Sequence, residues 1–293
     1  MYLKYLYVIL FLLCIGCNTK RNTFKLNPVP GEVYNYSITK TSSQEWTYQN
    51  VAHKTFDTLQ LDIGLQGMKN NGDTITCKLM FNNLKIIPRP NEVTFIYLNP
   101  LMKINPYNPF VIDSICYLLQ GLSVQVDITA DGNITEVHGI DDLATNISNT
   151  SKVEVNMIKK MLADYVSVNA VKDLLNRILS IPRDKEVKIS DSWIKSITLM
   201  TKAPVKFSNM YTLKKITGDT AYVEIQSIVS TATTSAGDNV YLKGKHEGEA
   251  ILSYTTGMPY KYDTKLESVT TTTVYDVIYN EHFTVKRSSS VPQ

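Results

Sequence analysis

Hydrophobic and polar residues alternate with a period of two along most of this 293-residue chain. The first such region covers residues 31–87, where polar residues separate Tyr34, Tyr36 and Ile38. This pattern is typical of β-strands that bury one face. It recurs after Pro182 and predicts further strands at 193–200, 205–216, 220–233, 241–254 and 260–277.

Between these two regions the spacing of apolar residues becomes helical. A helix is predicted over 110–120, followed by strands at 122–129 and 134–137 that flank a turn at Asp131-Gly132. Two further segments, with apolar stripes from Ile158 and from Val171, predict helices that face a core.

The starts of these helices carry polar residues that suit helix caps. Ser151 with Glu154 forms a capping-box pattern before the first of the two later helices, and Asn169 is expected to cap the second. Asp141-Asp142 is expected to supply an N-cap and a first-turn charge to a helix that begins there.

The order of strands, helices and strands predicts an α+β fold, predominantly antiparallel β-sheet, with a central helical segment at 141–181. We expect a single domain over 31–287 and a C-terminal tail at 288–293. Gly72-Asp73-Thr74 recurs as Gly218-Asp219-Thr220. Either the domain holds two duplicated strand units, with halves 31–140 and 182–287, or the repeat reflects common turn chemistry.

The N-terminus has the parts of a secretory signal peptide in residues 1–16. Lys4 precedes an apolar stretch, Leu6–Leu13, that is shorter than the roughly 20 residues needed to span a bilayer. Leu13-Cys14-Ile15-Gly16-Cys17 resembles the lipobox of bacterial lipoproteins. The resemblance implies cleavage before Cys17 and acylation of its thiol, for example with palmitate, and two or more acyl chains anchor a protein stably to a membrane.

The residues after Cys17 bear on where the protein is held. Asn18 stands where Asp would favour the inner membrane, so the resemblance implies the outer membrane. Lys20 and Arg21 replace the acidic residues that favour export to the cell surface, and we expect the periplasmic face. Residues 17–30, which are polar and hold two prolines, are predicted to form a flexible tether.

Several turn and strand-end motifs resemble an uncharacterised family of bacterial lipoproteins known only as a domain of unknown function. They include Leu119-Gln120-Gly121, Asp131-Gly132-Asn133-Ile134 and Val187-Lys188-Ile189-Ser190-Asp191-Ser192-Trp193. The resemblance spans residues 31–275. It implies a fold and carries over no functional residue.

Charge and motifs narrow the function classes. Removing residues 1–16 takes away only Lys4, so 29 of the 30 basic residues remain against 27 acidic ones, which argues against nucleic acid as a partner. The sequence lacks the Gly-x-Ser-x-Gly elbow of serine hydrolases. The histidines His53, His138, His246 and His282 are scattered, and His246 is assigned to a solvated strand face, so no enzyme activity, cofactor or metal is predicted.

Two cysteines and one loop remain as features to place. Cys77 and Cys116 either form a disulfide or are two separately buried thiols. The proline-rich segment 88–110 carries Phe95, Tyr97, Tyr107 and Phe110. These aromatic residues either cap the core or line an apolar ligand site with the loop as its lid.

Three functions of different class follow from these features. The first is a non-catalytic binding or scaffold module of the cell envelope, with an envelope protein as partner. The second is a carrier of a lipid-like apolar small molecule, held in a groove beneath the loop. The third is an unrecognised hydrolase, for which the sequence offers no motif.

Overall fold

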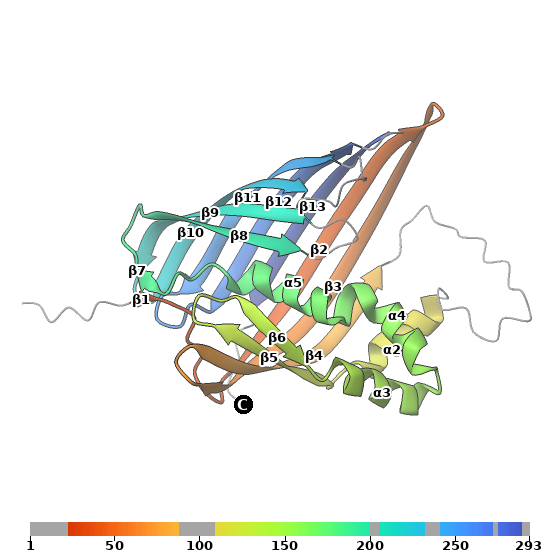
Figure 1. Ribbon diagram of the computed structural model, residues 1–293, viewed down its shortest axis with the longest axis horizontal. Coiled ribbons are helices and arrows are strands. Elements are labelled where there is room, and N and C mark those ends of the chain that lie inside the picture. Colours follow the sequence, from red (N-terminus) through yellow and green to blue (C-terminus); the bar gives the residue numbers. More distant parts are fainter. Residues whose placement is uncertain (1–22, 88–108, 200–204, 232–240, 272–274, 289–293) are drawn as a thin grey trace, which may run out of the picture.

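The computed structural model describes residues 23–87, 109–199, 205–231, 241–271 and 275–288 (Figure 1). Eleven strands form the main sheet: β2 (Val33–Tyr48), β3 (Val51–Asn70), β4 (Thr74–Ile87), β5 (Ser123–Thr129), β6 (Ile134–His138), β8 (Ser192–Leu199), β9 (Val205–Thr217), β10 (Thr220–Thr231), β11 (Tyr241–Ser253), β12 (Pro259–Thr271) and β13 (Asp276–Arg287). Two short strands, β1 (Thr23–Phe24) and β7 (Lys185–Glu186), pair separately. The predicted α+β fold with a large antiparallel sheet is confirmed.

The sheet consists of two runs of consecutive strands, which meet where β2, its first strand in the sequence, pairs with β13, its last. Its order is β6-β5-β4-β3-β2-β13-β12-β11-β10-β9-β8, and each of its pairs is antiparallel. Only the β2–β13 contact in this sheet joins strands that are not consecutive in the chain. The short strands β6 and β8 are therefore its two edges, where unpaired backbone groups need a cover.

The predicted helices are α2 (Pro109–Leu118), α3 (Ile140–Ser151), α4 (Val155–Val166) and α5 (Val168–Leu179). Figure 1 shows α3, α4 and α5 in front of one face of the sheet, with α5 running beside both edges. Asn176 of α5 accepts a hydrogen bond from the backbone N–H of Ile134 on β6 at 2.8 Å. The Trp193 indole of β8 donates to the carbonyl of Ile181, just after α5, at 2.9 Å. The connection between the edges thus covers both of them.

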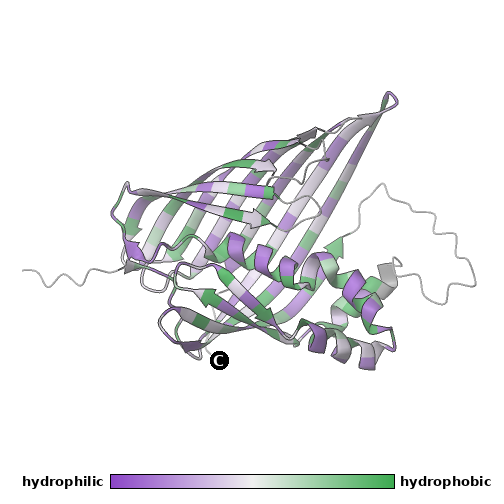
Figure 2. Cartoon of the chain, in the orientation of Figure 1, coloured by the Kyte–Doolittle hydropathy of each residue, from purple (hydrophilic) through white to green (hydrophobic). Residues whose placement is uncertain are grey.

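The inner face of the sheet packs against these helices and forms the main core. Apolar and polar residues alternate along the strands (Figure 2), and on β4 every second residue from Ile75 to Phe81 is buried. Tyr34, Tyr211 and Tyr262 are among the largest fully buried side chains. Among the helices of the described residues, none has both the length and the apolar composition that crossing a bilayer requires.

The segment predicted as a tether over 17–30 belongs to the fold from residue 23 onward. Phe24 is fully buried, its ring stacked on Tyr254 at 5.7 Å and edge-on to Trp193 at 6.0 Å. Leu26 is buried as well. The prolines that suggested a flexible linker instead lead the chain along the sheet into β2.

Three local predictions were wrong. Residues 260–277 form no single strand, because β12 ends at Thr271 and β13 begins at Asp276. The N-caps of the later helices are Glu154 and Ser167 rather than Ser151 and Asn169. Asp141 and Asp142 lie in the first turn of α3 as predicted, but its N-cap is Gly139.

The repeated Gly-Asp-Thr motifs occupy equivalent turns in two successive meanders. The first joins β3 to β4 and the second joins β9 to β10, each being the second hairpin counted from β2 and from β8. Two strand connections further along the chain, the β5–β6 and β11–β12 turns contain Gly132 and Gly257, both with positive φ. A Cβ at either glycine would collide with a backbone carbonyl, of Leu179 or of Lys25. These motifs are thus turn positions of one sheet, and the division into two duplicated halves stays a prediction.

Candidate functional site

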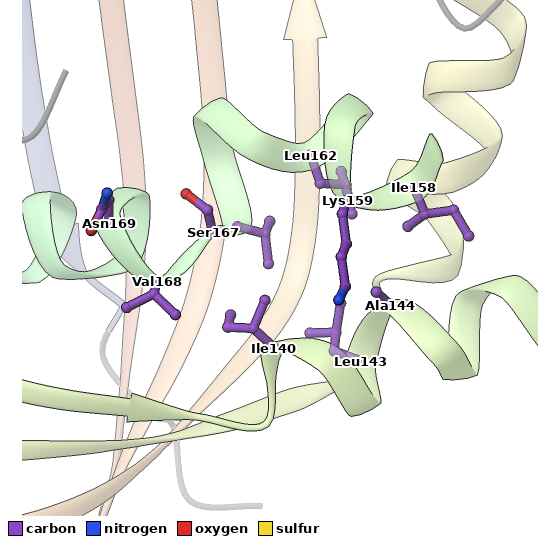
Figure 3. Close-up of a pocket in the computed structure, with 10 residues that line it drawn as sticks. Ile140, Leu143, Ala144, Ile158, Lys159, Leu162, Ser167, Val168 and Asn169 are labelled. Carbon is purple, nitrogen blue, oxygen red and sulfur yellow. The ribbon is translucent and has the colours of Figure 1, made fainter. Parts of the chain in front are cut away.

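An apolar pocket of about 310 Å³ lies where α3, α4 and the start of α5 converge (Figure 3). Seven of its ten lining residues are apolar, and the remaining three are a lysine, a serine and an asparagine. The lining comprises Ile140, Leu143, Ala144, Ile158, Lys159, Leu162, Val166, Ser167, Val168 and Asn169. An apolar cavity with a few polar groups is the usual form of a small-molecule site.

The pocket exists because the chain breaks between α4 and α5. Ser167 has an extended conformation, with φ −75° and ψ 166°, so the helix cannot continue through it. Its hydroxyl donates to the carbonyl of Ala163 at 2.6 Å and accepts from the N–H of Ala170 at 3.2 Å. One side chain therefore ends α4 and caps α5, and the change of direction leaves space against α3.

The pocket has one cationic group at its edge. The Lys159 side chain extends from α4 toward α3 (Figure 3), where its Nζ lies 2.7 Å from Oδ1 of Asp141. The two side chains are 40% and 83% exposed. Exposed ion pairs of this kind contribute about 0–1 kcal/mol, so an anionic group of a ligand can replace Asp141 at little cost.

The predicted site residues lie mostly outside the described part of the chain. This holds for Cys17, Phe95, Tyr97 and Tyr107. Phe110 lies in the first turn of α2, and its side chain is also outside the described residues. The predicted lid and its aromatic lining therefore stay predictions, and the helix pocket is a different place.

Cys77 on β4 and Cys116 on α2 are free, buried thiols. Of the two alternatives predicted for this pair, the structure therefore has the two separately buried thiols and not the disulfide. Burial raises the pKa of Cys77 to about 12 and that of Cys116 to about 11. Neither thiol is therefore a thiolate near neutral pH, which is the form that reacts or binds metals.

A row of polar side chains crosses the inner face of the sheet beyond the main core. Strand pairing aligns its members, and the apolar Leu266 of β12 lies in line between His246 of β11 and Glu281 of β13. We call this set the polar row: Lys195, Asn209, Ser227, His246, Glu281 and Ser42. Beyond it lies a second, smaller apolar cluster: Ile197, Leu199, Phe207, Val229 and Leu266.

Arg177 of α5 reaches this row from the helix side. Its guanidinium donates to Oε1 of Glu281 at 2.5 Å and lies 4.4 Å from the Phe283 ring. Tyr279 donates to the other carboxylate oxygen of Glu281 at 2.6 Å. Burial raises the pKa of Glu281, but the charges of Arg177 and Lys40 and the hydrogen bonds from Arg177 and Tyr279 together lower it to about 2. The pair is thus a buried, charged contact between helix and sheet.

His246 was placed on a solvated strand face by the sequence, and this was wrong. It is 2% exposed and faces inward, with Nδ1 3.1 Å from the Ser227 hydroxyl, which donates to Asn209 at 2.5 Å. Its Nε2 has no hydrogen-bond partner among the described residues. Burial, helped by the positive charge of Arg177, lowers the pKa of His246 to about 3, so the ring is neutral. Its phase on the strand, shared with Ala250 and Leu252, was the available signal.

Comparison with known proteins identifies a family and no activity. The model of a family of unknown function (DUF6263) matches residues 106–276, more than half of the chain. No curated protein matches the sequence. A solved structure described as "lipid-protein interactions in lipovitellin" is 13% identical with a TM-score of 0.49, over 89% of this chain and 25% of that one. This chain thus spans about a quarter of the lipovitellin chain.

A second solved structure is the translocator domain of the autotransporter NalP from Neisseria meningitidis. It is 9% identical with a TM-score of 0.21, over 89% of each chain. Similarity at these levels says nothing about what this chain binds.

Proposed function

Because the chain belongs to a family of unknown function (DUF6263), whose description assigns no activity, we propose its function from the pocket. The protein is a non-catalytic binding module of the bacterial cell envelope. It holds a small apolar molecule with an anionic head group, such as a fatty acid, between α3, α4 and α5.

The observation that carries this proposal is the apolar lining of the helix pocket. At about 310 Å³ it lies at the lower end of the roughly 300–1,000 Å³ typical of small-molecule sites, which suits one short acyl chain. Leu143, Ala144, Ile158 and Leu162 are themselves nearly fully buried, so the walls are held by the core. Each methylene taken from water into such a site contributes about 0.8 kcal/mol.

Lys159 is the feature that favours an anionic head group. It is the one charged residue of the lining, and its Asp141 partner is largely exposed to solvent. A carboxylate at the pocket edge would take the place of Asp141 on the ammonium group. A neutral head group would gain nothing from that exchange.

A fluorescent fatty acid tests the pocket. Purified protein carrying Cys17→Ser should bind dansyl-labelled undecanoic acid saturably. Ala144→Phe, which places a ring in the pocket, should abolish binding with an unchanged circular dichroism spectrum. Lys160→Ala removes an exposed neighbour that does not line the pocket and should bind as the parent does. Equal binding by the parent and Ala144→Phe would refute the proposal.

The head group is tested by comparing two competitors of the labelled acid. The parent protein should prefer dodecanoic acid to dodecanol, and Lys159→Ala should reduce that preference by several-fold because about 0–1 kcal/mol is at stake in an exposed ion pair. An unchanged preference in Lys159→Ala would remove Lys159 from the site while leaving the apolar pocket in place.

The lipid anchor at Cys17 would place this site at the outer membrane, on its periplasmic face. The support is the lipobox-like Leu13-Cys14-Ile15-Gly16-Cys17. Metabolic labelling with a fatty-acid probe in a Gram-negative host should tag the wild type and Cys14→Ser but not Cys17→Ser. Labelling of all three would contradict an anchor at Cys17.

A further inference from the structure

Two carboxylates and one imidazole meet on the outer face of the sheet, on strands β5 and β6, and none of the three lines the helix pocket. Asp127 of β5 is paired directly with Glu136 of β6, and His138 is two residues further along β6. One side-chain ligand atom from each of the three lies within 4.8 Å of those of the other two. No local sequence motif marks this cluster, because Asp127 comes from β5 whereas Glu136 and His138 come from β6.

The spacing of these atoms suits a tetrahedral metal ion. His138 Nε2 lies 3.1 Å from Oε2 of Glu136 and 3.3 Å from Oδ2 of Asp127. Zinc binds nitrogen and oxygen ligands at about 2.0–2.2 Å, and tetrahedral ligands at that distance are about 3.3–3.6 Å apart. The three side chains could therefore bind one ion with small adjustments, and the exposure of His138 (48%) and Glu136 (65%) lets an ion enter.

The two facing carboxylates, Asp127 and Glu136, would also be stabilised by a bound cation. Like charges directly opposite each other on antiparallel strands are destabilising, and Asp127 and Glu136 are such a pair. The second oxygen of Asp127, Oδ1, accepts a hydrogen bond from the Thr76 hydroxyl at 2.8 Å. This contact holds the carboxylate in orientation, as the outer partners of metal ligands commonly do.

We propose that Asp127, Glu136 and His138 form a binding site for a first-row divalent cation such as Zn²⁺. One imidazole nitrogen with two carboxylate oxygens suits zinc, whereas Mg²⁺ and Ca²⁺ prefer oxygen ligands alone. Three protein ligands leave a fourth position for water. His138 also lines an open groove of about 570 Å³ with Lys78, Gln125 and Asp142, which gives solvent access to that position.

The same sheet offers a matched control. His282 of β13 lies 2.8 Å from Oδ1 of Asp263 on β12, again a cross-strand imidazole and carboxylate on the outer face. The third group of this pair is a cation, because Lys261 lies 3.4 Å from the other carboxylate oxygen of Asp263. In the proposed metal site the third group is a second carboxylate, Glu136. A cation is already present, so this pair should not take a metal ion.

Isothermal titration of the purified protein with Zn²⁺ tests the site. One equivalent should bind to the wild type. Removing a direct ligand by His138→Ala or Asp127→Asn should weaken binding by at least about tenfold, since loss of outer partners alone costs about 10–100-fold. His282→Ala should bind as the wild type does, and Mg²⁺ should not compete.

Two results would overturn the proposal. One is the absence of saturable zinc binding, which would mean that His138 only forms polar contacts with the two carboxylates. The other is zinc binding that His138→Ala and Asp127→Asn leave unchanged. The site shares no residue with the fatty-acid pocket, so Ala144→Phe should not alter zinc binding and His138→Ala should not alter fatty-acid binding. The two proposals can therefore fail independently.

Discussion

The main core and the polar row lie on the same face of the same strands, yet they are held together differently. In the main core, inward-facing apolar residues such as Ile225 and Val285 are sealed by the helices. Further along the same strands, the inward-facing positions hold His246 and Glu281, and Arg177 of α5 binds the Glu281 carboxylate. The first region depends on packing and the second on satisfied polar contacts, so their responses to mutation and pH should differ.

The largest effect should follow from breaking the charged contact of the polar row. Arg177→Ala leaves Glu281 buried without its partner and should lower the free energy of unfolding in urea by about 3–5 kcal/mol. The double variant Arg177→Met with Glu281→Leu should recover most of that loss, because it leaves no uncompensated charge. A loss below about 1 kcal/mol in Arg177→Ala would show that the pair is solvated.

In the main core, Phe24→Ala should cost about 3–5 kcal/mol of unfolding free energy, because a large buried ring is removed. Val29→Ala, in the same N-terminal segment but 46% exposed, should change it by less than about 0.5 kcal/mol. If both variants had the same small effect, the segment before β2 would be the flexible tether that its composition suggests.

The polar row should also make stability depend on pH. The unfolded chain protonates His246 below about pH 6.5, whereas the folded protein does so only near pH 3. The unfolded state therefore binds more protons in this window, and stability should fall by about 1.4 kcal/mol per pH unit from pH 6.5 downward. Glu281, with its pKa lowered to about 2, adds a further loss only below about pH 4.5.

His246→Leu isolates this effect. Urea unfolding at pH 6.5 and at pH 5 should show about 2 kcal/mol of difference in the wild type and much less in the variant. Equal pH dependence in both proteins would mean that His246 is accessible to protons in the folded state.

The smallest expected effect concerns the N-cap of α5, which is Ser167 in the structure and was predicted to be Asn169. Ser167→Ala removes the hydroxyl that accepts from Ala170 and should cost about 1 kcal/mol of unfolding free energy. Asn169→Ala, at the residue that the sequence favoured, should cost less than about 0.5 kcal/mol. The reverse order would place the start of α5 two residues later.

The sequence predicted most of the sheet because burial of one strand face leaves a period of two, as in Ile75, Cys77 and Leu79 on β4. It also placed the central helices and the strand predicted at 193–200, which the structure has as β8. The Gly-Asp-Thr turns were recognised because positive φ and tight turns restrict residue type strongly.

The polar row was missed because alternation is judged by residue type. His246 and Glu281 count as exposed in such a pattern, and only partners from other elements, Ser227 and Arg177, make their burial tolerable. The helix pocket depends on the angle between α3 and α4, which periodicity does not contain. Phe24 was missed because two nearby prolines suggested a linker.

The binding of an apolar ligand between the helices is tested most directly by methyl nuclear magnetic resonance. On titration with dodecanoic acid, the methyl signals of Ile140, Ala144 and Leu162 should shift, whereas those of Ile225 and Val285 in the main core should stay in place. Ala144→Phe should suppress the shifts. Two results would contradict a ligand site in this pocket. One is that only methyl signals of the sheet shift. The other is that no signals shift at dodecanoic acid concentrations that displace the labelled acid from the protein.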